Sequence, residues 1–136
     1  MEVSQRGFTA GMSVLGHDIT PIRDDSGIVQ VNLNTLLKES DVISLNCNLT
    51  DSNVHMLSYE QFRLMKKESY IINCARGPLI DESALIDALQ SDSIAGAALD
   101  VMEQEPLKLT NDLCNLKNCI LGSHNSSNTH LSLIHI

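Results

Sequence analysis

Charged and titratable side chains follow several apolar segments of this chain, at the point where each segment ends. Asp18, Arg76 and Asp100 stand at or just beyond such ends, and His124 directly follows the last segment. Glu105 lies in the stretch after Asp100. A permanent cation, a titratable imidazole and several carboxylates could together bind an anionic ligand and move a proton. Each residue alone could be a solvated loop residue, but the set favours a functional site.

Apolar runs alternate along the chain with segments of helical periodicity, a pattern typical of βα units and a parallel sheet. The runs expected to form strands are residues 12–18, 28–31, 42–46, 70–75, 94–100 and 118–123. The segments expected to form helices are residues 32–41, 59–67 and 81–90, with Asn32 and Ser58 as N-caps of the first two. Ligands of open parallel sheets bind outside the carboxyl ends of the strands. The fold would therefore bring the polar residues together.

The composition suits one α/β domain and excludes several classes of function. The chain has 136 residues, 43% of them hydrophobic and 19% charged, which is enough for one core. Nine basic and seventeen acidic residues give a net charge of −8, so we expect no nucleic-acid partner. No apolar run has the length of a membrane span, so we expect no membrane partner.

Cysteine usage points to a reducing compartment. No two cysteines form a CxxC pair, which favours buried free thiols in a cytoplasmic protein over disulfides or a metal site. The four cysteines are Cys47, Cys74, Cys114 and Cys119.

Three motifs in a fixed order resemble a known family. They are "INCARGPLIDESALIDAL", "IAGAALDVMEQEP" and "ILGSH", and the resemblance extends from about Gly11 to about Thr129. This pattern is similar to the NAD-binding domain of the D-isomer-specific 2-hydroxyacid dehydrogenases, of which phosphoglycerate dehydrogenase is a member. The resemblance implies a Rossmann-like parallel sheet with flanking helices.

The resemblance implies catalytic roles for three residues. Arg76 matches the arginine that binds the carboxylate of the 2-hydroxy or 2-oxo acid, a task for which the planar guanidinium is suited. The alternative is a surface arginine paired with Asp81 or Glu82. His124 matches the general acid/base, and Glu105 matches the carboxylate that orients this histidine.

Further residues match positions that bind the cofactor. Asp18 matches the acid that accepts hydrogen bonds from the adenosine ribose, which favours NAD over NADP. Asp100 matches the acid near the nicotinamide carboxamide. The other expected contacts to NAD are Cys74, Ala75, Arg76, His124, Ser126 and Ser127.

The chain also departs from the family pattern. It contains no G-x-G-x-x-G, the motif whose backbone amides hold the pyrophosphate. We therefore expect residues 1–130 to be a partial NAD-binding domain that lacks the first strand and the glycine loop. Residues 131–136, "LSLIHI", resemble the translation of a sequencing adapter, and we expect a non-native tail there; a native apolar tail is the alternative.

The function implied by the resemblance is hydride transfer between a D-2-hydroxy acid, such as a phosphoglycerate-like acid, and NAD. The expected partners are the small 2-hydroxy or 2-oxo acid and a second copy of the full-length protein, as a homodimer or larger assembly. The alternative function is a non-catalytic, NAD(H)-responsive interaction module of the same fold. We expect the 136-residue chain on its own to have no dehydrogenase activity.

Overall fold

The computed structural model describes residues 2–23 and 26–125 of the chain. The expected tail at 131–136, together with Ser126 and Ser127, lies outside these residues. The strands are β1 (Leu15–Gly16), β2 (Val29–Gln30), β3 (Val42–Leu45), β4 (Tyr70–Asn73), β5 (Gly96–Leu99) and β6 (Cys119–Leu121). All pairings are parallel, and the strands form two sheets, β1-β2 and β3-β4-β5-β6. The predicted strands are confirmed in order and are shorter than expected.

Helices connect the strands as the βα pattern predicts. They are α1 (Glu2–Thr9), α2 (Leu33–Glu39), α3 (Tyr59–Phe62) and α4 (Glu82–Gln90), with 3₁₀ turns at Gly77–Leu79 and Asp112–Asn115. Asn32 is the N-cap of α2, because its side chain accepts the Thr35 N–H at 2.8 Å. Ser58 is the N-cap of α3, where the Gln61 side chain accepts the Ser58 N–H at 3.2 Å.

The prediction of a helix over 59–67 was wrong in length. Hydrogen bonds of the i→i−3 type replace the helical ladder after Phe62, since Leu64 N–H donates to Gln61 and Met65 N–H donates to Phe62. Such bonds tighten the last turn of a helix and end it. α3 is therefore a single turn.

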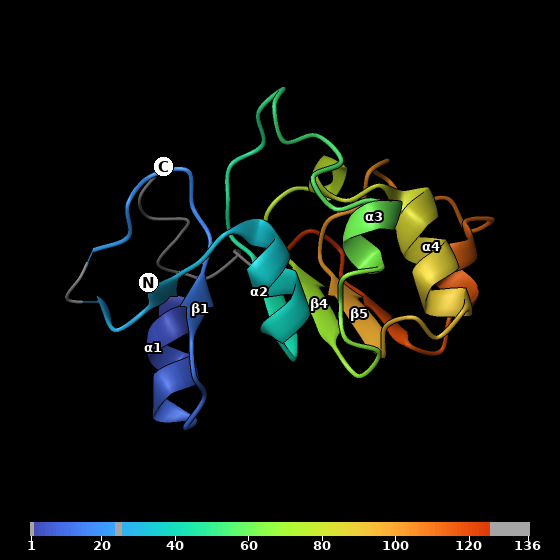
Figure 1. Ribbon diagram of the computed structural model, residues 1–136. Helices are drawn as coiled ribbons and strands as arrows, with labels where there is room; N and C mark the ends of the chain where they lie inside the picture. Colours follow the sequence, from blue (N-terminus) through green and yellow to red (C-terminus); the bar gives the residue numbers. More distant parts are fainter. Residues whose placement is uncertain (1, 24–25, 126–136) are drawn as a thin grey trace.

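Helices α2, α3 and α4 lie on one face of the four-stranded sheet (Figure 1). Ile43, Ile71 and Leu99 point from the strands into this layer, where Leu37 of α2 and Leu85 of α4 meet them. Alternate strand residues point the other way: Val42, Tyr70 and Ile120 are exposed. The period-2 alternation of β-strands thus puts the core under the helices.

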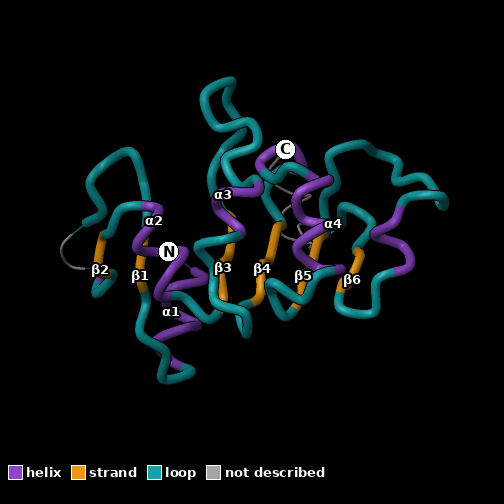
Figure 2. The backbone as a smooth tube through the Cα atoms, turned by 45° about the vertical axis from the view of Figure 1, so that its right-hand side comes forward, coloured by secondary structure: helices purple, strands orange, loops and turns teal. Residues whose placement is uncertain are grey.

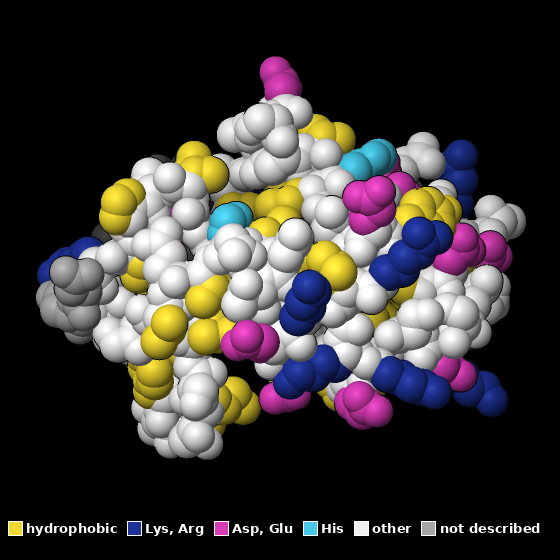
Figure 3. Space-filling view, viewed as in Figure 1, with side chains coloured by type: hydrophobic (Ala, Val, Ile, Leu, Met, Phe, Trp, Pro, Cys, Tyr) yellow, Lys and Arg dark blue, Asp and Glu magenta, His cyan; other side chains and the backbone are white. Residues whose placement is uncertain are grey.

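β1 and β2 form a smaller unit beside the main sheet, and Figure 2 shows the strands in the order β2, β1, β3, β4, β5, β6. No described residue before Leu37 is buried. Hydrophobic side chains are exposed over α1 and β1 in Figure 3, and Val3, Phe8 and Met12 are exposed members of this region. The expected α/β architecture of parallel strands and flanking helices is confirmed, and its core belongs to β3–β6.

The prediction of buried cysteines was wrong. Cys47, Cys74 and Cys114 are exposed and Cys119 is half-buried, although all four are free. Cys47 and Cys74 follow their strands, at the sheet edge where the chain turns outward. Among the described residues, no helix combines the length and the apolar character that a membrane crossing needs.

Candidate functional site

His124 and Glu105 form a close pair. Nδ1 of His124 lies 2.7 Å from Oε2 of Glu105, and the second oxygen, Oε1, accepts the Met102 N–H at 3.0 Å. Because a carboxylate only accepts, Nδ1 carries the hydrogen in this contact and Nε2 is left for proton exchange. The hydrogen bond from His124, followed by that from the Met102 amide, lowers the pKa of Glu105. Glu105 therefore stays a carboxylate at moderately acid pH.

The backbone holds this pair from two loops. His124 follows β6 in the left-handed region, with φ of 57°, and Glu105 stands in the loop after β5. β5 and β6 are neighbours, so their carboxyl ends deliver both loops to one edge of the sheet. The Gly122 Cα approaches Asp100 so closely that a Cβ there would lie 2.3 Å from its Oδ1. Gly122 therefore permits the approach of the two loops.

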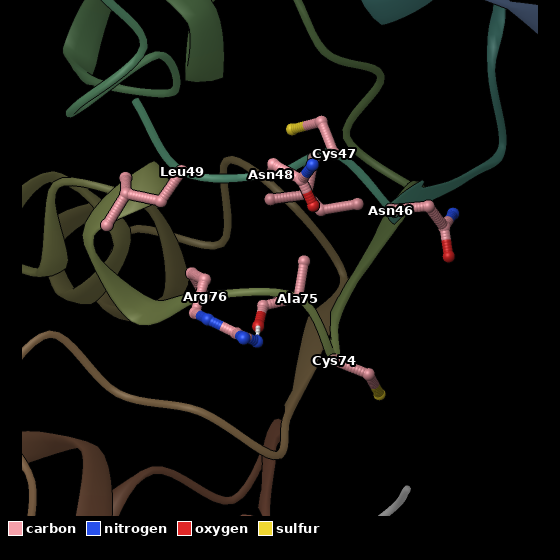
Figure 4. Close-up of a pocket in the computed structure, with 8 residues that line it drawn as sticks. Asn46, Cys47, Asn48, Leu49, Cys74, Ala75 and Arg76 are labelled. Carbon is pink, nitrogen blue, oxygen red and sulfur yellow. Dashed lines mark hydrogen bonds between the residues drawn. The ribbon is translucent and has the colours of Figure 1, made fainter. Parts of the chain in front are cut away.

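Arg76 lines a cavity of about 450 Å³ outside the carboxyl ends of β3 and β4. The segment from Asn46 to Leu49 forms one wall, and Cys74, Ala75 and Arg76 form the other (Figure 4). Nη1 of Arg76 donates to the Ala75 carbonyl oxygen at 2.6 Å. Arg76 is the charged residue among those that line the cavity, so the cavity suits an anionic group. The alternative, a pairing of this arginine with Asp81 or Glu82, is not found among the described residues: Asp81 accepts from Ser58 and Ala84, and Glu82 accepts from Asn111.

Asn73 builds the turn that carries Arg76. It is 1% exposed, and its side chain donates to the Arg76 carbonyl oxygen at 2.9 Å and accepts the Ala75 N–H at 3.0 Å. These bonds end β4 and fix the backbone on both sides of the exposed Cys74. Sequence reasoning missed this residue; the signal was a lone amide at the end of the apolar run Tyr70–Asn73.

The turn after Arg76 packs against the loop that leads to Glu105. A Cβ on Gly77 would lie 1.8 Å from the Met102 carbonyl oxygen, which only a glycine avoids. Met102 is also the residue whose N–H holds Glu105. Backbone contact therefore couples the cation of the cavity to the His124–Glu105 pair.

Asp100 and Asp18 occupy separate positions at the sheet edges. Asp100 is 8% exposed, and its Oδ1 accepts the Asn125 N–H at 3.2 Å. Asp18 accepts from the backbone N–H and the hydroxyl of Thr20, both at 2.8 Å, and these bonds lower its pKa. Desolvation raises the pKa of the Cys47 thiol, although the residue as a whole is exposed, and the charge of Asp18 acts in the same direction.

The cavity suits one part of a dinucleotide. It is open at the carboxyl edge of a parallel sheet, where such ligands bind. The smallest side chain of the wall, Ala75, leaves room for a ring or a ribose beside Arg76. Of the residues expected to contact NAD, Cys74, Ala75 and Arg76 line this cavity. Asp18, Asp100 and His124 are not among the lining residues, and Ser126 and Ser127 lie outside the described residues.

Known proteins resemble the chain in sequence and in fold. Residues 1–126 match the model of the family described as D-isomer specific 2-hydroxyacid dehydrogenase, NAD binding domain. Glyoxylate/hydroxypyruvate reductase B of Cronobacter sakazakii is 50% identical over 99 residues, which are 73% of this chain and 31% of that protein. D-3-phosphoglycerate dehydrogenase of Methanocaldococcus jannaschii is 41% identical over 132 residues, which are 94% of this chain and 25% of that protein.

A solved structure agrees with the sequence relatives. The NAD-complexed D-isomer specific 2-hydroxyacid dehydrogenase of Lactobacillus delbrueckii ssp. bulgaricus has a TM-score of 0.88 and 32% identity; the match covers 96% of this chain and 44% of that one. The chain thus spans less than half the length of these relatives. Its parallel sheets and flanking helices are Rossmann-like, and its domain type binds NAD. The chain belongs to the D-isomer specific 2-hydroxyacid dehydrogenase family.

Proposed function

We propose that the protein containing this chain transfers a hydride between the C2 carbon of a small D-2-hydroxy acid and NAD. The observation that carries the proposal is the 2.7 Å His124–Glu105 pair at the same sheet edge as the Arg76 cavity. An alcohol loses a proton and a hydride on oxidation to a ketone. The site offers a group for the proton and a cation for the carboxylate.

Each residue has a task in this reaction. Arg76 binds the substrate carboxylate with its planar guanidinium, which never loses its charge. His124 takes the hydroxyl proton on Nε2 during oxidation and returns it during reduction. Glu105 accepts the Nδ1 hydrogen, keeps the ring in one tautomer and orients it. When bound, NAD supplies the carbon that accepts the hydride.

The part of the site that this chain supplies suits a substrate with one carboxylate better than a phosphorylated acid. Arg76 is the charged residue of its lining, and a phosphate beside the carboxylate would call for a second cation. The proposal therefore favours short 2-oxo acids such as glyoxylate and hydroxypyruvate, the acids in the name of the Cronobacter relative, over a phosphoglycerate-like acid.

The test uses a chimera in which this chain replaces the matching segment of the Cronobacter reductase. We expect the chimera to oxidise NADH in the presence of short 2-oxo acids. The decrease in NADH absorbance measures this rate. Arg76→Lys should lower kcat/KM by roughly 10- to 100-fold, because a lost charged hydrogen bond costs about 1.5–3 kcal/mol. The KM for NADH should change little.

Two results would count against the proposal. Unaltered kinetics in Arg76→Lys with every acid would remove the carboxylate-binding role of Arg76. Tight NADH binding without turnover of any acid would favour the NAD(H)-responsive interaction module. Lys38→Ala, on the outer side of α2, is the control for loss of a surface cation.

A further inference from the structure

A second histidine–carboxylate pair lies outside the cavity and outside the His124–Glu105 pair. Nε2 of His55 lies 2.7 Å from Oε1 of Glu103, although 48 positions separate the two residues in the sequence. Both side chains are partly exposed, at 41% and 34%. An exposed ion pair contributes only about 0–1 kcal/mol to stability, so its role must be sought in what it connects.

His55 is anchored by its backbone as well as its ring. Its N–H donates to the Pro78 carbonyl oxygen at 2.8 Å, in the turn that follows Arg76. Its φ of 54° lies in the left-handed region, which residues other than glycine adopt at a cost of about 1–2 kcal/mol. The ring is therefore held in a defined place, at the end of the loop that begins with the cavity wall.

Glu103 uses both carboxylate oxygens. Oε2 accepts the Glu82 N–H at the start of α4 at 3.1 Å, while Oε1 faces His55. The Glu103 N–H in turn donates to the Glu82 carboxylate at 3.4 Å, and Asn111 donates to that carboxylate at 2.6 Å. The loop after β5 is thus fastened to α4 on one side and to His55 on the other.

This fastened loop is the one that presents Glu105. Glu103 follows Met102, whose N–H holds Glu105 and whose carbonyl oxygen packs on Gly77. His55 therefore connects three segments: the loop of the cavity wall, the turn after Arg76, and the Glu105 loop. Release of the ring from Glu103 would remove the side-chain link between the Glu105 loop and the loop of the cavity wall, and would leave the Gly77–Met102 contact as the link to the turn after Arg76.

We propose that His55 and Glu103 are a positioning pair that holds Glu105 against His124. The effect of this pair on catalysis rests on the proposed function. Its effect on the position of Glu105 can be measured in this chain alone. Neither residue touches the cavity. The pair acts through the loop backbone, by fixing where the Glu105 carboxylate stands.

The experiment measures the pKa of the Glu105 carboxyl from its ¹³C chemical shift as a function of pH. It uses the 136-residue chain without cofactor or substrate, in His55→Asn, Glu103→Gln and the double variant. Asparagine tolerates the left-handed backbone but is too short to reach Glu103. Glutamine keeps the length of Glu103 but has one acceptor oxygen, which cannot serve both His55 and the Glu82 N–H.

The two single variants separate positioning from charge. If Glu103 acted only through space, its neutralisation would remove a like charge and lower the pKa of Glu105, whereas loss of His55 would raise it. If the pair positions Glu105, both variants weaken the His124–Glu105 bond and both raise the pKa of Glu105. The double variant should then add little to either single change, because both break one contact.

Asp41→Asn is the matched control, because it neutralises the carboxylate of another exposed 2.7 Å pair, with Lys66, and should leave the Glu105 titration unchanged. Opposite shifts in the two single variants, or no shift in either, would overturn the proposal. If His55→Asn unfolds by circular dichroism, the sign of the shift in Glu103→Gln decides alone. A chimera without turnover would refute the proposed function and leave this titration as it is.

Discussion

His124 and Glu105 are nineteen positions apart in the sequence, yet Nδ1 of the histidine lies 2.7 Å from Oε2 of the glutamate. Neighbouring parallel strands explain this approach. β5 and β6 run side by side in the same direction, so the loops that leave their carboxyl ends begin at one edge of the sheet. The pair is a consequence of strand order, and several properties of the chain can be tested against it.

The first prediction concerns acid titration of Glu105. Its pKa lies below the ordinary value of 4.5, first because of the hydrogen bond from His124. A lowered carboxyl pKa stabilises the folded chain at pH above 4.5, and this contribution is lost as the pH falls through the lower, folded value. In His124→Asn the ¹³C-detected midpoint of Glu105 should rise toward 4.5. His17→Asn, the same change at another exposed histidine, should leave it unchanged; equal midpoints in both variants would show that the pair does not form.

The second prediction concerns the buried amide of Asn73. Asn73→Ala removes both hydrogen bonds that shape the Arg76 turn and leaves the Ala75 N–H and the Arg76 carbonyl oxygen without these partners. The free energy of unfolding in urea should fall by about 1–3 kcal/mol. The control Asn46→Ala removes an exposed amide that donates a hydrogen bond to the Ser44 carbonyl oxygen. Its free energy of unfolding should change by no more than about 0.5 kcal/mol. Equal losses would mean that the turn does not depend on Asn73.

The third prediction concerns thiol reactivity. Burial raises the pKa of Cys119 to about 11, so roughly one molecule in a thousand carries its thiolate at pH 8. Maleimide should therefore label Cys119 much more slowly than the exposed Cys114, and the rate at Cys119 should increase with pH toward 11. Mass spectrometry of peptides from a time course measures both rates. Equal rates for the two thiols at pH 8 would contradict the burial of Cys119.

The fourth prediction concerns cofactor binding by the 136-residue chain. The sequence has no G-x-G-x-x-G to hold a pyrophosphate, and β1-β2 forms a sheet separate from β3–β6. We therefore expect weak NADH binding in calorimetry and no reduction of 2-oxo acids. Circular dichroism controls for folding. Micromolar NADH binding together with cooperative unfolding would show that the β3–β6 edge is sufficient for the cofactor.

Much of this protein is determined by local sequence alone. The alternation of apolar runs and helical periods predicts the order of strands and helices, because the period of side-chain burial differs between the two. Asn32 and Ser58 mark helix starts because the first backbone N–H groups of a helix have no partner within the helix. The Asn32 side chain accepts one of them in α2, and Ser58 and Gln61 form a capping box in α3. The motif around Arg76 and the histidine after the last strand indicate the family and the candidate site.

Other features are decided only by the tertiary structure. The strands form two sheets because β1 pairs with β2 and β3 pairs with β4, while β1 and β3 are not hydrogen-bonded to each other. The residues within one strand do not determine which other strand it pairs with. α3 ends at Phe62 although helix-forming residues continue, because i→i−3 bonds take over. The exposure of Cys47 and Cys74 follows from their place just beyond the strand ends.

The same division applies to the candidate site. The sequence indicated Arg76, Glu105 and His124 as residue types suited to anion binding and proton transfer. The nineteen positions between Glu105 and His124 do not tell how far apart the two side chains lie in the fold. Asn73 gave only the signal of a lone amide at the end of an apolar run, and His55 and Glu103 gave none, since a buried amide and an exposed ion pair acquire meaning only from their partners. Hydrogen bonds act over about 3 Å, and only the parallel packing of β3–β6 brings residues so far apart in the chain within that range.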